Sequence, residues 1–227
     1  MRRRGIFITL EGIDGTGKST QFRLLVRYLR RRGYRVCATR EPGGTKVGEK
    51  VRSILLASCT GKLAPLAELA LIYAARAQHL EEVVRPALAR GDVVVSDRFN
   101  DASFAYQGYG RQLGVATVQA FDRVISGRTQ PDLTLVFDLE PRVALARAHG
   151  REARRNSRHG RFETQGHAFH QRVWRGYLEI ARRDPARVRL VDASRPVKDI
   201  QANVRELVDL FLGRQKFQRG RRSRNSG

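Results

Sequence analysis

The chain has 227 residues, of which 41% are hydrophobic and 29% are charged, a composition typical of a globular protein. This length predicts one domain, or one domain with an insertion. The apolar runs are short, as at 133–139, whereas a membrane helix needs about 20 apolar residues, so no membrane segment is predicted. No secretory signal peptide is expected at the basic start. Two cysteines provide neither a disulfide framework nor a metal cluster, and we expect a reducing, cytoplasmic environment.

The net charge is the unusual quantity. Lysine and arginine number 44 against 22 acidic residues, which gives a formal charge of +22. Such a charge is typical of a nucleic-acid-binding protein, but it also suits an enzyme that acts on phosphate-bearing substrates. Only six of the 44 basic residues are lysine, so the excess is arginine, and genome composition explains it as readily as function does. Charge alone therefore decides neither fold nor function.

Strands and helices alternate along the chain. The first half predicts a buried strand at 5–11, an amphipathic helix at 19–33, a strand at 34–39, and helices at 47–56 and 66–88. The second half predicts strands at 93–96, 133–137 and 188–191, with helices at 115–126, 141–150 and 197–212. The β-branched run at 93–95 indicates a strand buried on both faces. This alternation predicts a parallel α/β sheet with helices on both sides.

Two basic segments lack this periodicity. Residues 150–160 contain four arginines and no apolar repeat. Residues 213–227 carry six basic residues, no acidic residue and one phenylalanine, which predicts a solvated, disordered tail. We therefore predict a single domain over 1–212, followed by a basic tail at 213–227.

The strongest motif follows the first strand. Residues 12–19 match the phosphate-binding loop pattern G-x-x-x-x-G-K-[ST] in its required place between a strand and a helix. Glycines let backbone N–H groups converge on phosphate oxygens, and the helix N-terminus adds positive charge. Lys18 can reach the β- and γ-phosphates, and Ser19 can bind Mg²⁺. The predicted nucleoside triphosphate loop comprises Gly12, Ile13, Asp14, Gly15, Thr16, Gly17, Lys18 and Ser19.

The end of the strand at 93–96 indicates the phosphoryl acceptor. No guanine-reading Asn-Lys-x-Asp pattern is present, which argues against a GTPase, and Asp97 is followed by Arg98 rather than by the second carboxylate of a mechanical ATPase. Asp97 can hold the Mg²⁺ shell, and Arg98 suits a second phosphate. Asp14 either caps the following helix or contacts the acceptor's sugar or a cation. The pattern favours a kinase whose acceptor is itself phosphorylated.

Several further motifs occur together and in order. Residues 11–19 are followed by 40–45 (Arg-Glu-Pro-Gly-Gly-Thr), 73–79 (Tyr-Ala-Ala-Arg-Ala-Gln-His), 97–99 (Asp-Arg-Phe), 105–108 (Ala-Tyr-Gln-Gly), 131–135 (Pro-Asp-Leu-Thr-Leu) and 161–163 (Arg-Phe-Glu). With this set the chain resembles the thymidylate kinase family over about residues 5–212. The resemblance implies that the γ-phosphoryl group of ATP is transferred to dTMP, giving dTDP and ADP for dTTP synthesis.

The resemblance also implies an architecture. The family has a three-layer P-loop NTPase fold, with a five-stranded parallel sheet flanked by helices and a mobile lid at about 150–163. It is usually a homodimer that uses Mg²⁺. On the phosphate side, Arg98 resembles the arginine that holds the acceptor phosphate, and Asp97 the acid near Mg²⁺. Asp14 resembles the carboxylate beside the acceptor sugar and phosphate, and Tyr106 the residue that crowds the 2′ position.

The resemblance implies a base-binding side as well. Arg76 resembles the arginine that hydrogen-bonds the thymine edge, and Ser103 and Gln107 lie where the family contacts thymine's polar groups. Many members stack thymine on a phenylalanine at one of two neighbouring offsets before the arginine, which are Ile72 and Tyr73 here. Tyr73 can stack as phenylalanine does, whereas Ile72 offers apolar contact alone. The implied dTMP set is Asp14, Glu41, Pro42, Tyr73, Arg76, Arg98, Ser103, Tyr106 and Gln107.

Several of these roles have plainer alternatives. Arg76 is otherwise a solvated helical arginine, Tyr106 a core residue, and Pro42 a rigid turn after Glu41.

The lid segment supplies the remaining implied roles. Some family members carry a catalytic arginine in the phosphate loop, where this chain has Gly15; others supply it from the lid. The lid holds Arg151, Arg154, Arg155 and Arg158, with Arg147 before and Arg161 after. The resemblance implies a catalytic set of Lys18, Asp14, Arg98, Arg151, Arg155 and Arg158, and an ATP contact from Arg147. The alternative is a basic loop without a catalytic role.

Chemistry and composition weigh against two other functions. A monophosphate oxygen is already anionic, so positioned cations suffice and no general base is required. A deoxynucleoside kinase would need such a base, for which only Glu11 or Asp14 is available. A nucleic-acid-binding module with an ATPase loop would interleave aromatic with basic residues, yet the tail has only Phe217. We expect dTMP and ATP as partners, with nucleic acid limited to weak contact with the tail.

Overall fold

A central parallel sheet organises the chain. The computed structural model describes the backbone of residues 4–57, 63–155 and 165–224, and the side chains of 4–57, 63–150 and 165–214. The strands are β1 (Ile6–Glu11), β2 (Val36–Arg40), β3 (Val93–Asp97), β4 (Leu133–Asp138) and β5 (Val188–Asp192). They pair in the order β2-β3-β1-β4-β5, and every described pair is parallel. The predicted fold class is confirmed.

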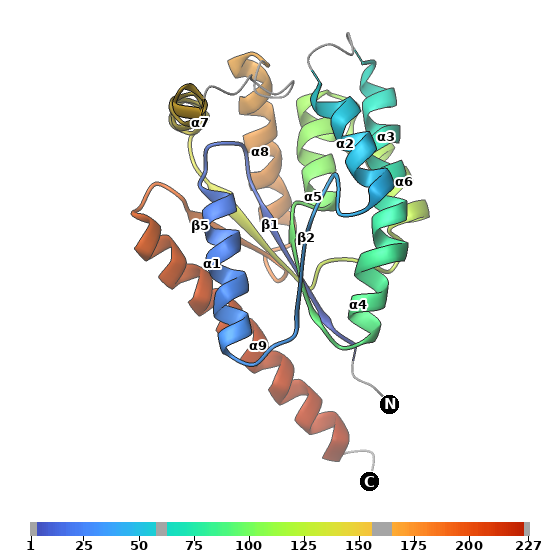
Figure 1. The fold of residues 1–227 in the computed structure, drawn as a ribbon, viewed down its shortest axis with the longest axis vertical. Coiled ribbons are helices and arrows are strands. Elements are labelled where there is room, and N and C mark those ends of the chain that lie inside the picture. The colour runs from blue at the N-terminus through green and yellow to red at the C-terminus, as the bar shows by residue number, and fades with distance from the viewer. Residues whose placement is uncertain (1–3, 58–62, 156–164, 225–227) are drawn as a thin grey trace.

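Helices cover this sheet. They are α1 (Lys18–Arg31), α2 (Lys46–Leu56), α3 (Pro65–His79), the π-helical turn η1 (Leu80–Val84), α4 (Arg85–Ala89), α5 (Asn100–Ser103), the π-helical η2 (Phe104–Gly110), α6 (Val115–Ile125), α7 (Pro141–Arg155), α8 (His167–Arg183) and α9 (Val197–Arg224). Helix α1 packs beside α9, whereas α3 packs between α2 and α6 (Figure 1). Helix α8 runs along η2.

Strand β1 divides the core into two sides. Ile8 and Leu10 belong to the core cluster that includes Leu25 of α1. Phe7 points the other way and packs edge-on against Phe99, with ring centroids 4.9 Å apart. Since side chains alternate along a strand, Glu11 lies on the Phe7 side, beneath the segment that follows β3.

Several helical segments differ from the sequence prediction, which omitted α5 and η2. The chain forms α8, which the prediction omitted although its apolar residues Phe169, Val173, Tyr177 and Ala181 recur every four positions. Helix α7 continues past Gly150 to Arg155, into the segment assigned to the lid. Helix α9 continues to Arg224, through most of the segment predicted as a disordered tail. That segment is rich in arginine and glutamine and contains no proline, so its local preference permits a helix.

The carboxyl ends of three neighbouring strands meet at one edge. Leu10 of β1 and Arg40 of β2 both pair with Asp97 of β3. The segments that follow these strands therefore begin side by side, which is where α/β proteins usually bind ligands. No helix in the described part of the chain is both long and apolar enough to cross a membrane.

Candidate functional site

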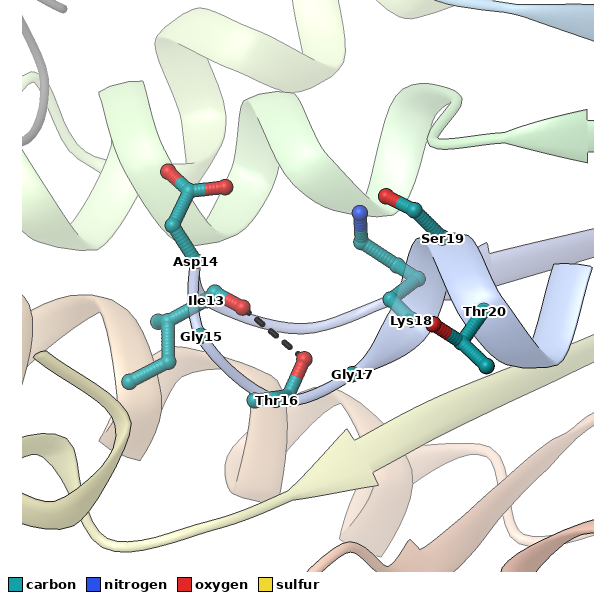
Figure 2. Close-up of a pocket in the computed structure, with 8 residues that line it drawn as sticks. All are labelled: Ile13, Asp14, Gly15, Thr16, Gly17, Lys18, Ser19 and Thr20. Carbon is teal, nitrogen blue, oxygen red and sulfur yellow. Dashed lines mark hydrogen bonds between the residues drawn. The ribbon is translucent and has the colours of Figure 1, made fainter. Parts of the chain in front are cut away.

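The phosphate loop forms a pocket between β1 and α1. Residues 13–20 line it, and Thr16 Oγ1 donates to the Ile13 carbonyl at 2.9 Å (Figure 2). Figure 2 shows the side chains of Asp14 and Lys18 on the same side of the loop. Gly15 has a φ of +87°, and a Cβ there would lie 1.8 Å from the Ala144 carbonyl oxygen of α7. The close approach of α7 leaves no room at this position for a side chain as large as arginine.

Lys18 joins the loop to the end of β3. Its ammonium lies 2.6 Å from Asp97 Oδ1. Burial alone raises the pKa of Asp97, but Lys18 and then Arg98 outweigh it and hold that pKa below its usual range. Asp97 therefore remains a carboxylate at neutral pH, as an oxygen ligand for a divalent cation must.

Arg98 is the central cation of the site. Its Nη2 donates to Asp14 at 3.0 Å and to the Tyr106 hydroxyl at 3.2 Å, and its Nη1 donates to the Tyr177 hydroxyl at 3.2 Å. Desolvation raises the pKa of Asp14, but Arg98 and Lys18 more than reverse this effect. The backbone of Arg98 has a φ of +71°, an uncommon conformation for a residue with a side chain. Such strain is concentrated at functional sites.

Glu11 of β1 anchors the segment that follows β3, at Arg98 and Phe99. It accepts hydrogen bonds from the Phe99 N–H at 2.7 Å and from the Tyr177 hydroxyl at 2.9 Å. Burial, and then the charge of Asp101, raise the pKa of Glu11 to about 8. The Tyr177 hydroxyl thus bridges Glu11 and Arg98. A hydroxyl can donate once and accept twice, so both contacts are satisfied together.

Arg76 forms a second buried cluster. Its Nε donates to Glu41 at 2.7 Å, and its Nη2 donates to the Phe99 carbonyl at 3.0 Å and to Ser103 Oγ at 2.9 Å. His79 Nδ1 lies 2.8 Å from the other Glu41 oxygen. Burial raises the pKa of Glu41, but Arg76 and His79 outweigh it and keep that pKa low. Among the described residues, none accepts a hydrogen bond from the buried Nη1 of Arg76.

Tyr73 and Ile72 occupy different faces of α3. Tyr73 is fully buried toward α6, where its ring centroid lies 5.5 Å from that of Phe121. The Arg76 guanidinium stacks on the same ring, with its Cζ 4.4 Å from the centroid. Tyr73 thus packs beneath Arg76, and its contact with the base stays a prediction. Ile72 lies four residues before Arg76, on the same face of the helix.

Gln107 and Tyr106 come from η2. Gln107 is buried and donates from Nε2 to Glu68 at 2.9 Å. Tyr106 is buried and contributes its hydroxyl to Arg98, so it is more than a core residue. Tyr106 thus contacts Arg98 and Gln107 contacts Glu68, while their contacts with dTMP stay predictions.

Three site residues were missed or left without a role. Arg52 of α2 donates to the Pro42 carbonyl at 3.0 Å. Partial burial and then repulsion from Arg40 lower the pKa of Arg52, and the charges of Arg98 and Asp97 also act on it. Its signal is a basic residue one turn from the end of an amphipathic helix. Tyr177 was missed because α8 was not predicted, and Glu11 was considered only as a base.

The predicted lid residues are only partly described. Arg147 Nη1 donates to the Ala193 carbonyl at 2.9 Å, which ties α7 to the loop after β5. The side chains of Arg151, Arg154 and Arg155 lie outside the described residues, as does residue 158 entirely, so their catalytic role stays a prediction. No cluster of three or more histidine, cysteine or carboxylate ligands exists among the side chains that the structure describes.

Comparison with known proteins identifies the family. The sequence profile described as "Thymidylate kinase" matches residues 10–204. A thymidylate kinase of Pseudomonas syringae pv. syringae is 50% identical over 212 residues, covering 93% of this chain and 99% of that protein. One of Pseudomonas savastanoi pv. phaseolicola is 49% identical over 208 residues, covering 92% and 97%.

A solved structure agrees. The crystal structure of thymidylate kinase from Ehrlichia chaffeensis matches with a TM-score of 0.73 and 30% identity, covering 91% of this chain and 99% of that one. Sequence and structure thus agree over nearly the same span. The chain belongs to the thymidylate kinase family, whose members phosphorylate dTMP to dTDP with ATP.

Proposed function

We propose that this chain performs the family reaction where the phosphate loop meets the segment after β3. One observation carries the assignment. Asp97 is paired with Lys18 of the loop at 2.6 Å, and Arg98 follows it directly, so one strand end joins the donor side to the acceptor side. Lys18 contacts the β- and γ-phosphates of ATP, together with the backbone N–H groups of residues 13–19.

Mg²⁺ fits this donor side. Ser19 offers a hydroxyl and Asp97 an anionic carboxylate, and phosphate oxygens and water complete the shell that Mg²⁺ prefers. When bound, the ion neutralises charge on the phosphates and orients them. Asp97 also holds the Lys18 ammonium in place, which limits its freedom before nucleotide binds.

Arg98 holds the 5′-phosphate of dTMP, and Arg52 assists from α2. Both cations lie near Asp97, so the acceptor oxygen is directed toward the γ-phosphate. That oxygen is already anionic, and Arg98 stabilises the charge that develops during transfer. Asp14 lies beside the sugar, and Tyr106 lies where a 2′-hydroxyl would have to fit.

The thymine edge is bound between α3 and η2. The unpartnered Nη1 of Arg76 donates to a base carbonyl, and Gln107 contributes its amide. Ile72 lies between Glu68 and Arg76 along α3 and supplies apolar contact to the ring. Glu41 and Ser103 act indirectly, since both hold Arg76.

The lid arginines and the assembly are further proposals. Arg151, Arg155 and Arg158 are candidates to stabilise the transferring phosphoryl group, and Arg147 contributes to the ATP site beside the loop after β5.

A homodimer is supported by the exposed face of α3, where Ala67, Ala70, Ala74 and Ala77 form a small-residue surface. Ala74→Arg should then give a monomer by light scattering, whereas an unchanged dimer would exclude this face. A cytoplasmic location remains a prediction from the sequence.

Release of ADP from Mg-ATP tests the function directly. The acceptors are dTMP, dUMP, dCMP, the ribose form of TMP and thymidine. We expect turnover with dTMP far above the others. Turnover with thymidine, or with none of them, would contradict the roles given to Arg76, Arg98 and Tyr106 while leaving the phosphate loop unaffected.

A further inference from the structure

The amide of Gln107 is held in one orientation by a carboxylate. Gln107 Nε2 lies 2.9 Å from Glu68 Oε1, and both side chains are buried. A carboxylate only accepts hydrogen bonds, so it must face the NH₂ end of the amide. The orientation of Gln107 therefore follows from chemistry.

Arg111 holds the Glu68 carboxylate in place. Its Nε donates to Glu68 Oε1 at 3.1 Å, and its Nη2 donates to Oε2 at 3.0 Å. This fork-to-carboxylate geometry is the strongest that arginine makes. The guanidinium also lies over the Phe169 ring, 4.8 Å from the centroid, and Nη1 donates to Gln165 at 2.7 Å. Arg111 is thus fixed from three sides, and it fixes Glu68 in turn.

The Glu68–Gln107 and Arg76–Ser103 contacts both join α3 to the segment formed by α5 and η2. Glu68, Ile72 and Arg76 are spaced four residues apart on α3 and share one face. Ser103 and Gln107 are also four apart, on α5 and η2, and each bonds to one end of that face. Ile72 lies between the two contacts. With Nε2 bonded to Glu68, the side-chain oxygen Oε1 of Gln107 is the end of the amide that can accept a hydrogen bond from a ligand.

These two contacts leave one donor and one acceptor for a base. Arg76 Nη1 is the donor, and Gln107 Oε1 is the acceptor. Thymine presents the complement: a carbonyl at C4 and an N–H at N3. Cytosine presents the reverse, an amino group at C4 and a bare N3, so it meets two mismatched partners.

Building on the proposed function, we infer that Glu68 and Arg111 are positioning residues for base selection. They fix the Gln107 amide so that its oxygen faces the acceptor base and rejects cytosine. Without them the amide could rotate and offer its NH₂ group to the N3 of cytosine.

Glu68→Gln tests the inference with little change in volume. The new amide can accept or donate, so Gln107 loses its fixed orientation. The measurement is kcat/KM for dTMP, dCMP and dUMP. We expect the dTMP-to-dCMP ratio to fall about tenfold, the size of one hydrogen bond to a charged or buried group. The dTMP-to-dUMP ratio should stay constant, because uracil presents the same edge as thymine.

A double-mutant cycle separates positioning from structural support. With Gln107→Leu already present, Glu68→Gln should leave the dTMP-to-dCMP ratio unchanged, because the amide it orients is gone. If Glu68→Gln does not fold, Arg111→Lys keeps the charge but loses the fork, and should lower the ratio in the same direction.

Two outcomes would overturn the inference. One is a dTMP-to-dCMP ratio that does not change in the variants, whether kcat/KM falls equally for all three substrates or stays constant. The other is a ratio change of the same size with and without Gln107. A wild-type protein that does not use dTMP would instead refute the proposed function. If the wild type prefers dTMP and its dTMP-to-dCMP ratio is unchanged in Glu68→Gln and Arg111→Lys, only the role of Glu68 and Arg111 is refuted.

Discussion

The donor loop and the acceptor site differ in how many parts of the chain build them. The donor pocket is lined by one continuous segment, residues 13–20, and relies largely on backbone groups. The acceptor site collects side chains from residues far apart, such as Glu11 and Tyr177, which are 166 residues apart. Backbone positions at a strand–helix turn are set locally, whereas side-chain charges must be brought together by the fold.

The donor loop and the acceptor site also differ in how deeply their charged side chains are buried. In the donor loop the Lys18 side chain is 8% exposed, but its partner Asp97 is 24% exposed. The acceptor site buries Arg76 against Glu41, with both side chains at most 3% exposed. A buried charge without its partner is costly. The acceptor site should therefore contribute to stability as well as to activity, and the donor loop mainly to activity.

Loss of the Arg76 guanidinium is expected to have the largest effect on stability. Arg76→Met removes the cation that faces Glu41, and we expect the free energy of unfolding to fall by about 3 kcal/mol or more. Arg40→Met removes an exposed pair with Glu49 and should cost less than about 1 kcal/mol. Urea unfolding of both variants measures the difference. Equal losses would remove the distinction between buried and exposed pairs.

Loss of the Lys18 ammonium should affect rate rather than stability. Lys18→Met should lower kcat about 10²–10³-fold, as expected when a group that stabilises transition-state charge is deleted. Lys50→Met changes an exposed lysine of α2 and serves as the matched control, with kcat unchanged. Steady-state ADP release gives both values. A Lys18→Met protein that kept about a tenth of wild-type kcat would show that the loop backbone and Mg²⁺ suffice.

The Tyr177 hydroxyl should matter only on the acceptor side. Tyr177→Phe breaks the bridge between Glu11 and Arg98, so we expect kcat/KM for dTMP to fall about tenfold while KM for ATP is unaffected. Tyr73→Phe removes a hydroxyl whose contacts are 3.4 Å long and should change kcat/KM much less. An equal change in KM for ATP and dTMP would mean that the bridge supports the whole site.

Glu11 should give the smallest effect, a pH dependence of stability. Its pKa is about 8 in the folded protein and 4.5 as a free group, so the folded state binds more protons between these values. The stabilisation is complete below the lower value and is lost as the pH rises through the higher one. Its slope is at most about 1.4 kcal/mol per pH unit.

Glu11→Gln keeps the neutral shape and removes this titration. The stability of the variant relative to wild type should therefore increase as the pH rises. Urea unfolding at several pH values between those two pKa values measures the trend. Parallel stability profiles would show that Glu11 is already ionised in the folded protein.

The sequence predicted the parts of this protein that depend on local pattern. The five strands lie close to their predicted ranges, and the phosphate loop and Asp97–Arg98 lie at the expected strand ends. Buried strands have continuous apolar runs, and the loop pattern is fixed by backbone geometry. Helix α8 also carried a local signal, a four-residue apolar repeat, which the prediction did not use.

Only the tertiary structure decided which residue of a neighbouring pair packs against α6. Ile72 and Tyr73 are adjacent, yet successive helix residues point about 100° apart, and periodicity does not say which neighbour covers which face. Packing against α6 buries Tyr73 beneath Arg76 and leaves Ile72 in line with Arg76 and Glu68. The bridge from Glu11 to Arg98 likewise required α8 to reach back to β1. Local sequence determined the strands and the donor loop, but the acceptor site came from long-range packing, because its charges are stable only when the fold brings their partners together.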